Sequence, residues 1–208
     1  MNYNSKKHHR RNIRLKGYDY SRAGLYFITI CTHNRMNLFG KIQHGKMILN
    51  SFGNIIKEEW EKTPSIRKNI SLGEYCIMPN HFHGIIEILE SNAIKKKELG
   101  RLKFIATFKA PSQNIGAIIR GFKGASTLKI KNSIRSKGGI ESKGELQFVP
   151  TAPTETIVIT AQTFSKKSIW QRNYYEHIIK DEKAFQNISK YIMNNPKKWK
   201  EDTFYKDK

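Results

Sequence analysis

The sequence predicts an α+β protein in which helices cover one face of an antiparallel sheet. Segments rich in β-branched and aromatic residues alternate with amphipathic segments of helical period. The predicted strands come in pairs joined by short connections, which is typical of antiparallel pairing. The chain has 208 residues, a length that suits one domain. Its longest apolar runs fall short of the ~18 residues that a membrane span needs, so we expect no membrane partner.

Strands are predicted where β-branched and aromatic residues gather: 25–32, 38–49, 71–78, 81–89 and 169–179. The second of these is interrupted by Gly40 and Gly45. Residues 33–35 are expected to form the turn of a hairpin between the first two strands. The break at Pro79-Asn80 joins the next pair.

Three helices are predicted by apolar residues at helical spacing. The first begins at the cap Asn50-Ser51 and ends before Pro64. The second runs from Asn114 to about Lys131, and the third follows the cap Asp181 and ends near Asn195-Pro196. Each has an apolar stripe and a polar back, so each should cover a sheet.

The order of these elements suggests a ferredoxin-like (RRM-like) sandwich, with an antiparallel sheet and helices on one face. Residues 1–22 form a basic arm, and residues 23–208 form the domain. Within the domain, residues 90–112 are expected to be a solvated loop, and residues 136–166 a flexible insertion with a short edge strand at 157–159.

The charge of the chain points to a polyanionic partner. Lysine and arginine number 38 against 17 acidic residues, a net charge of +21. This excludes an acidic tail and an ordinary near-neutral metabolic enzyme, and it favours nucleic acid as the partner over charge that serves solubility alone. Candidate phosphate contacts lie on the arm and on one stripe of the second helix: Arg10, Arg11, Arg14, Arg120, Lys123 and Lys131. For the arm, a merely solvated tail is an equally good interpretation.

The two cysteines, Cys31 and Cys76, make neither a zinc cluster nor a disulfide framework. The charged N-terminus has no apolar stretch behind it and does not predict a secretory signal. We therefore expect a cytoplasmic protein.

His81 and His83 are the sharpest candidates for chemistry. Residues i and i+2 of a strand point to the same face, so the two imidazoles project together while Phe82 faces the other way. If Phe82 packs under the helices, the histidines stand on the open face of the sheet, where paired neutral imidazoles can bind a divalent metal. The alternative is two surface histidines without a function.

Tyr191 and Asn195 form a second candidate pair on the last helix. They are four residues apart and therefore lie one above the other. A phenol has a pKa of ~10 and is a poor nucleophile unless a neighbour polarises its target or takes its proton. The alternative is a half-buried tyrosine at the edge of a helix face.

Two segments resemble one known family. Residues 75–84 (YCIMPNHFHG) look like the histidine–hydrophobic–histidine (HUH) segment of the IS200/IS605-type single-tyrosine transposases. Residues 169–179 (IWQRNYYEHII) followed by residues 191–196 (YIMNNP) are similar to its branch of REP-associated tyrosine transposases, where REP stands for repetitive extragenic palindrome. With the strand from Leu25 and the helix around Gly121, the similarity covers most of the chain outside the arm and the insertion.

The resemblance implies an enzyme that cleaves and rejoins single-stranded or hairpin DNA. The family's tyrosine attacks a phosphodiester and leaves a 5′-phosphotyrosine link and a free 3′-OH. By position, Tyr191 becomes the nucleophile, His81 and His83 become ligands of a divalent metal, Mg²⁺ or Mn²⁺, and Asn195 becomes a candidate third ligand. Some relatives carry glutamine in place of this asparagine. Some relatives are dimers that share active sites, so a homodimer and a monomer both remain open.

Rival nucleophiles and rival functions also remain open. Tyr174 and Tyr175 point to opposite faces of a strand, so only one can approach the histidines; we prefer Tyr191 and give the other two a structural or base-stacking role. A non-catalytic nucleic-acid-binding protein on the same fold is the main alternative. A metal-dependent hydrolase unrelated to DNA is a third, but Glu87 is a poor candidate for the extra ligand it needs.

Overall fold

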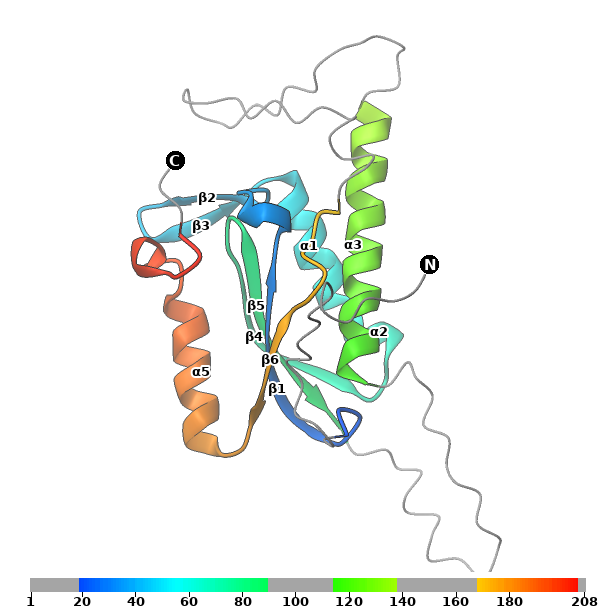
Figure 1. Cartoon of the computed structure of the whole chain (residues 1–208), viewed down its shortest axis with the longest axis vertical. Coiled ribbons are helices and arrows are strands. Elements are labelled where there is room, and N and C mark those ends of the chain that lie inside the picture. Colours follow the sequence, from blue (N-terminus) through cyan, green and yellow to red (C-terminus); the bar gives the residue numbers. More distant parts are fainter. Residues whose placement is uncertain (1–18, 90–113, 138–167, 206–208) are drawn as a thin grey trace, which may run out of the picture.

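The computed structural model describes residues 19–89, 114–137 and 168–205 (Figure 1). Its strands are β1 (Gly24–Cys31), β2 (Gly40–Gln43), β3 (Lys46–Leu49), β4 (Ile70–Ile77), β5 (His81–Ile88) and β6 (Tyr175–Ile179). Its α-helices are α1 (Ser51–Glu61), α2 (Thr63–Ile66), α3 (Ile115–Lys137) and α5 (Glu182–Asn194). Short 3₁₀ turns occur at η1 (His33–Arg35) and η4 (Trp199–Glu201).

The main sheet has four antiparallel strands in the order β4-β5-β1-β6. The chain reaches β4 from β1 through α1, and β6 from β5 through α3. This strand order and helix placement are those of the predicted ferredoxin-like sandwich. The two central strands are β5 and β1, so the histidine-bearing strand lies in the middle of the sheet.

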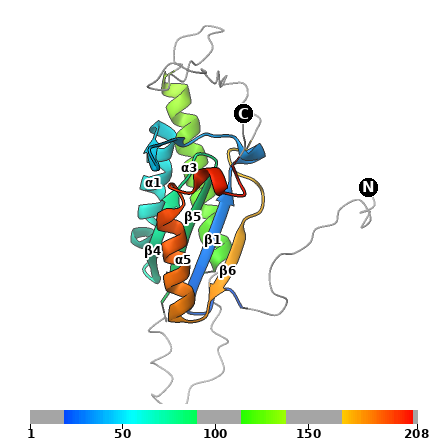
Figure 2. The same cartoon turned by 90° about the vertical axis from the view of Figure 1, so that its left-hand side faces the viewer.

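Helices α1 and α3 cover one face of the sheet and form the larger core with it (Figure 2). Alternation along β1 and β5 sends Tyr26, Ile28, Phe82 and Ile86 to this side. The Trp60 ring of α1 lies 4.5 Å from the Phe82 ring, centroid to centroid. The cap predicted for α1 is present, with Asn50 accepting a hydrogen bond from the Gly53 amide at 2.9 Å.

Helix α5 lies on the opposite face, against β4 and β5 (Figure 2). A smaller apolar cluster joins it to the sheet and consists of Phe27, Ile85, Ile179 and Ile192. Its predicted cap is confirmed, because Asp181 accepts from the Ala184 amide at 2.7 Å. The sequence predicts this face to be open, but α5 covers the part of it that β4 and β5 form.

The predicted hairpin between 25–32 and 38–49 is wrong. Strands β2 and β3 pair with each other, while β1 pairs with β5 and β6. The turn that joins β2 to β3 is His44-Gly45, whose φ angles of 49° and 71° match the two positive values of a type I′ turn. The glycine at position 45 marks a hairpin turn, not an interruption of one strand.

The predicted strand 169–179 is shorter than expected, because β6 begins at Tyr175. Before it, Trp170 makes an isolated bridge with Thr32, and its buried indole N–H donates to Ser126 Oγ at 3.0 Å. The predictions for the loop at 90–112, the insertion and the strand at 157–159, and all but the last few residues of the arm, lie outside the described residues. In the described part of the chain, no helix is both long and apolar enough to cross a membrane.

Candidate active site

His81 and His83 are buried side by side on the face of the sheet that α5 covers. Their exposed fractions are 0% and 1%, and their ring centroids are 4.5 Å apart. The C-terminal segment after α5 adds the cover that the sequence did not predict, since the Phe204 ring lies 4.7 Å from His81. The two histidines are thus interior groups, not surface ones.

Asn80 determines which ring nitrogen of His81 carries the hydrogen. Its Nδ2 donates to the Phe204 carbonyl at 2.9 Å and to the Arg35 carbonyl at 3.3 Å, so its Oδ1 faces the histidine as an acceptor. His81 Nδ1 lies 2.9 Å from that oxygen and must carry the hydrogen. Nε2 therefore holds a lone pair, and it is buried without a hydrogen-bond partner among the described residues.

His83 is held between Thr29 and Tyr191. Its Nδ1 lies 2.8 Å from Thr29 Oγ1, and its Nε2 lies 3.2 Å from the Tyr191 hydroxyl. Both partners are hydroxyls, so either tautomer satisfies the two contacts; in the tautomer with the hydrogen on Nδ1, Tyr191 donates to Nε2. The Phe27 ring stacks on the imidazole at 5.4 Å. That tautomer leaves Nε2 able to bind either a proton donor or a metal.

Tyr191 reaches the histidines from α5 and is still 47% exposed. Burial, and after it the charge of Asp202, raise the pKa of its phenol. The hydroxyl is therefore protonated at neutral pH and needs help to act as a nucleophile. Its exposure leaves room for a substrate on the solvent side.

Asp202 is the site residue that sequence reasoning missed. It lies just after η4, its side chain is 4% exposed, and its Oδ2 is 3.9 Å from His81 Nε2. One ligand atom from each of His81, His83 and Asp202 falls within 4.8 Å of the others. No periodic pattern marks this residue in the polar C-terminal segment, so only the fold reveals it.

Asn195, the predicted third ligand, lies beside Asp202. Its Nδ2 donates to Asp202 Oδ2 at 3.0 Å, and its Oδ1 is buried without a partner among the described residues. Two orphaned acceptors, this oxygen and His81 Nε2, thus meet beside a buried carboxylate. Buried acceptors without donors are costly, and a divalent cation would satisfy them. The residues present therefore fit a metal ion.

The histidines are neutral at any ordinary pH. Burial, and to a lesser degree the positive charge of Arg35, lower the pKa of His81 to about 3. Burial and the neighbouring His81 lower the pKa of His83 to about 3, against an opposing effect of Asp202. Neutral imidazole is the form that ligates metals.

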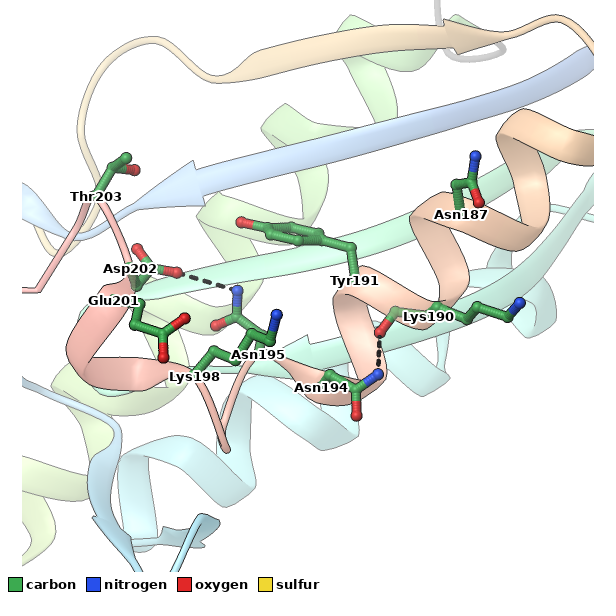
Figure 3. Close-up of a pocket in the computed structure, with 9 residues that line it drawn as sticks. All are labelled: Asn187, Lys190, Tyr191, Asn194, Asn195, Lys198, Glu201, Asp202 and Thr203. Carbon is green, nitrogen blue, oxygen red and sulfur yellow. Dashed lines mark hydrogen bonds between the residues drawn. The ribbon is translucent and has the colours of Figure 1, made fainter.

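A pocket of ≈ 430 Å³ opens beside Tyr191, between α5 and the C-terminal segment (Figure 3). Its lining includes Asn195 and Asp202 and, from the solvent side, two cations, Lys190 and Lys198. The pocket therefore joins the candidate metal ligands to the exposed tyrosine and to positive charge.

The predicted phosphate contacts are not brought to this pocket. Arg120, Lys123 and Lys131 lie on α3, in the layer across the sheet from α5 (Figure 2). The Lys123 ammonium donates to the carbonyls of Gln171 and Asn173 at 2.8 and 3.0 Å, and burial lowers its pKa to about 8. Arg10, Arg11 and Arg14 lie outside the described residues.

The rival tyrosines lie on opposite faces, as predicted. Tyr174 packs against the larger core with Lys123 5.6 Å above its ring. Tyr175 pairs with Thr29 across the ladder and so shares the face of His83. Tyr191, in contrast, places its hydroxyl 3.2 Å from His83 Nε2.

Sequence comparison relates the whole chain to known proteins, although no family model matches it. An uncharacterised protein of Haemophilus influenzae is 42% identical over 99% of this chain and 98% of its own length. A second protein of that organism, provisionally assigned as a REP-associated tyrosine transposase, is 23% identical over 91% of this chain and 84% of its own. The chain is thus similar over most of its length to a protein assigned to the REP-associated tyrosine transposases. This agrees with the resemblance of residues 75–84 and 191–196.

Two solved structures are also similar to this chain. A REP-associated tyrosine transposase bound to a REP hairpin shares 16% identity, with a TM-score of 0.49 over 89% of this chain and 74% of that one. A provisionally assigned transposase of Deinococcus radiodurans shares 13%, with a TM-score of 0.41 over 87% of this chain and 95% of that one.

Proposed function

We propose that this protein cleaves and rejoins single-stranded or hairpin DNA through a covalent bond between Tyr191 and a 5′-phosphate. The observation that carries the proposal is the Tyr191 hydroxyl, exposed to a pocket and 3.2 Å from His83 in a His81-His83-Asp202 cluster. Similarity to a protein assigned as a REP-associated tyrosine transposase and the net charge of +21 support DNA as the substrate.

The metal site is proposed on the chain's own donors. His81, His83 and Asp202 would hold a divalent cation, Mg²⁺ or Mn²⁺, and Asn195 would contribute its Oδ1 or hold the Asp202 carboxylate in place. When bound, such an ion neutralises phosphate oxygens and polarises the phosphorus as a Lewis acid. Asn80 and Thr29 orient the two imidazoles from behind.

The covalent step is an in-line exchange at phosphorus. The Tyr191 oxygen forms a bond to phosphorus as the bond from phosphorus to the 3′-oxygen breaks, and the tyrosine proton leaves while the 3′-oxygen gains one. Lys190 and Lys198 are placed to offset the charge of the strand entering the pocket. The reverse step, attack by a 3′-OH on the phosphotyrosine, rejoins DNA. Tyr191 lies against His83 of its own chain, which favours a site completed within one subunit.

A covalent-adduct assay tests the proposal. The protein is incubated with a labelled hairpin oligonucleotide and Mg²⁺ or Mn²⁺, denatured, and separated on a gel. We expect a denaturation-resistant adduct that Tyr191→Phe abolishes and that Tyr174→Phe, the matched control on the other face, retains. An adduct that survives in Tyr191→Phe would refute the assignment. DNA binding without adduct under every metal would favour the non-catalytic alternative.

A further inference from the structure

Helix α5 covers only part of its face of the sheet. Its packing is mainly against β4 and β5, and it touches β1 and the edge strand β6 through Phe27 and Ile179; among the described elements no second helix lies on this face (Figure 2). On β6, alternation sends Tyr175 and His177 to this side, and both are exposed. A strip of surface rich in rings therefore runs from the β6 edge toward the active site.

Tyr175 is the most notable residue of this strip because much of its side chain is exposed, although it lies in a strand. It is 49% exposed, and its hydroxyl makes no hydrogen bond within the part of the chain that the structure describes. Its ring meets the edge of Phe27, at a centroid distance of 6.4 Å. The Phe27 ring is itself 6.2 Å from Tyr191 and stacked on His83. One ring therefore separates Tyr175 from the nucleophile.

The segment that presents Tyr175 is fixed by contacts on the other side of the sheet. Lys123 binds the carbonyls of Gln171 and Asn173, and the Gln171 amide donates to the Cys31 carbonyl at 2.9 Å. Tyr174 is held below, against the larger core. An exposed ring on a rigid support loses little conformational entropy when it binds a flat partner.

We propose that the exposed Tyr175 ring, supported from within the sheet by Phe27, forms a shelf on which a base of the DNA strand stacks, next to the phosphate held at Tyr191. The proposal rests on the function proposed above and adds a subsite to it. Every base offers a π face, so such a shelf binds single-stranded DNA with little regard to sequence. An unpaired base is required, because stacked duplex bases do not expose their faces. The positive charge of the chain supplies the attraction for the backbone.

The test measures DNA binding in the Tyr191→Phe protein, where no covalent product forms. Fluorescence anisotropy follows a labelled single strand with Tyr175→Ala or Tyr175→Phe added, and Tyr174→Phe serves as the control. We expect Tyr175→Ala to weaken binding roughly tenfold and Tyr175→Phe to stay within about twofold, since the ring does the stacking. A scan with one abasic residue at a time should find one position where Tyr175→Ala has no further effect.

The outcomes separate this inference from the proposed function. Equal binding by Tyr175→Ala and its parent at every position would overturn the shelf and leave the Tyr191 chemistry untouched. A tenfold loss from Tyr175→Ala, combined with no adduct from the protein that keeps Tyr191, would support the shelf and contradict the chemistry. If Tyr175→Phe abolished the adduct while Tyr191→Phe retained it, Tyr175 would be the nucleophile and both proposals would be wrong.

Discussion

The two faces of the sheet are built from the same strands and serve opposite purposes. Toward α1 and α3, β1 and β5 place Tyr26, Ile28, Phe82 and Ile86 in an apolar core. Toward α5, the same two strands place Thr29, His81 and His83, which are as deeply buried as the apolar residues. One residue of register separates the two sets. The apolar face holds the larger core, and on the polar side His81 Nε2 and Asn195 Oδ1 are buried without a hydrogen-bond partner among the described residues.

The substitution His83→Ala tests the difference between the two faces with the largest expected effect. The change removes a proposed metal ligand and the partner of the Tyr191 hydroxyl, so we expect adduct formation to fall by at least about a thousandfold. Phe82→Ala, its neighbour on the apolar face, is the matched control. Adduct yield per folded molecule measures the difference; equal losses from both changes would mean that the polar face has no special role.

Phe82→Ala should instead lower stability. The Phe82 side chain is fully buried between Trp60 and Phe122, so its loss leaves a cavity and costs about 3–5 kcal/mol. Urea denaturation measures this cost. A change below about 1 kcal/mol would show that the apolar face is not the main source of stability.

Asp202→Asn tests whether the Asp202 carboxylate contributes to metal binding on the polar face. The amide keeps the shape of the side chain but removes the charge next to His81, and we expect Mn²⁺ affinity to fall about 10- to 100-fold. Isothermal titration calorimetry of the whole chain measures this change without any DNA. Glu201→Gln, an acidic neighbour that also lines the pocket, should leave the affinity within about twofold.

The polar face should also make the protein sensitive to acid. His81 and His83 have native pKa values of about 3, well below the ~6.5 of an unfolded chain, so between these pH values the unfolded state binds more protons. Stability is fully present above about pH 6.5 and falls as the pH drops toward 3. Urea titrations in chelator should show a smaller fall in His81→Gln. An equal pH dependence of the free energy of unfolding in both proteins would show that His81 does not contribute to the acid sensitivity.

The smallest effect concerns the predicted phosphate contacts of α3. Arg120 is exposed, whereas the Lys123 ammonium already binds carbonyls before β6. If Arg120 contacts DNA, Arg120→Gln should lower the log–log salt dependence of single-strand binding by roughly 0.7. Lys123→Gln should leave this slope unchanged and reduce stability by about 1 kcal/mol. If Lys123→Gln lowered the slope and Arg120→Gln lowered only the stability, Lys123 would be the DNA contact and Arg120 the structural residue.

The parts of this architecture that the sequence predicts are those with a periodic signal. Alternation around Phe82 places His81 and His83 on one face, and helical spacing and the Asp181 cap locate α5. Helical spacing pairs Tyr191 with Asn195, and the resemblance gives Tyr191 its role as nucleophile. Asp202 and the Phe204 cover have no such signal, because a 3₁₀ turn in a polar segment brings them to the histidines. The β2-β3 hairpin was missed because glycine at position 45 also suits an interrupted strand.

The most direct measurement maps the covalent bond itself. The adduct formed with a hairpin oligonucleotide is digested with nuclease and trypsin, and mass spectrometry locates the remaining nucleotide. Trypsin cleaves after Lys190 and after Arg172, so Tyr191 begins one peptide and the pair Tyr174-Tyr175 lies in another. We predict the nucleotide on Tyr191, in the peptide that begins there. A nucleotide on the peptide that begins at Asn173 would contradict the account.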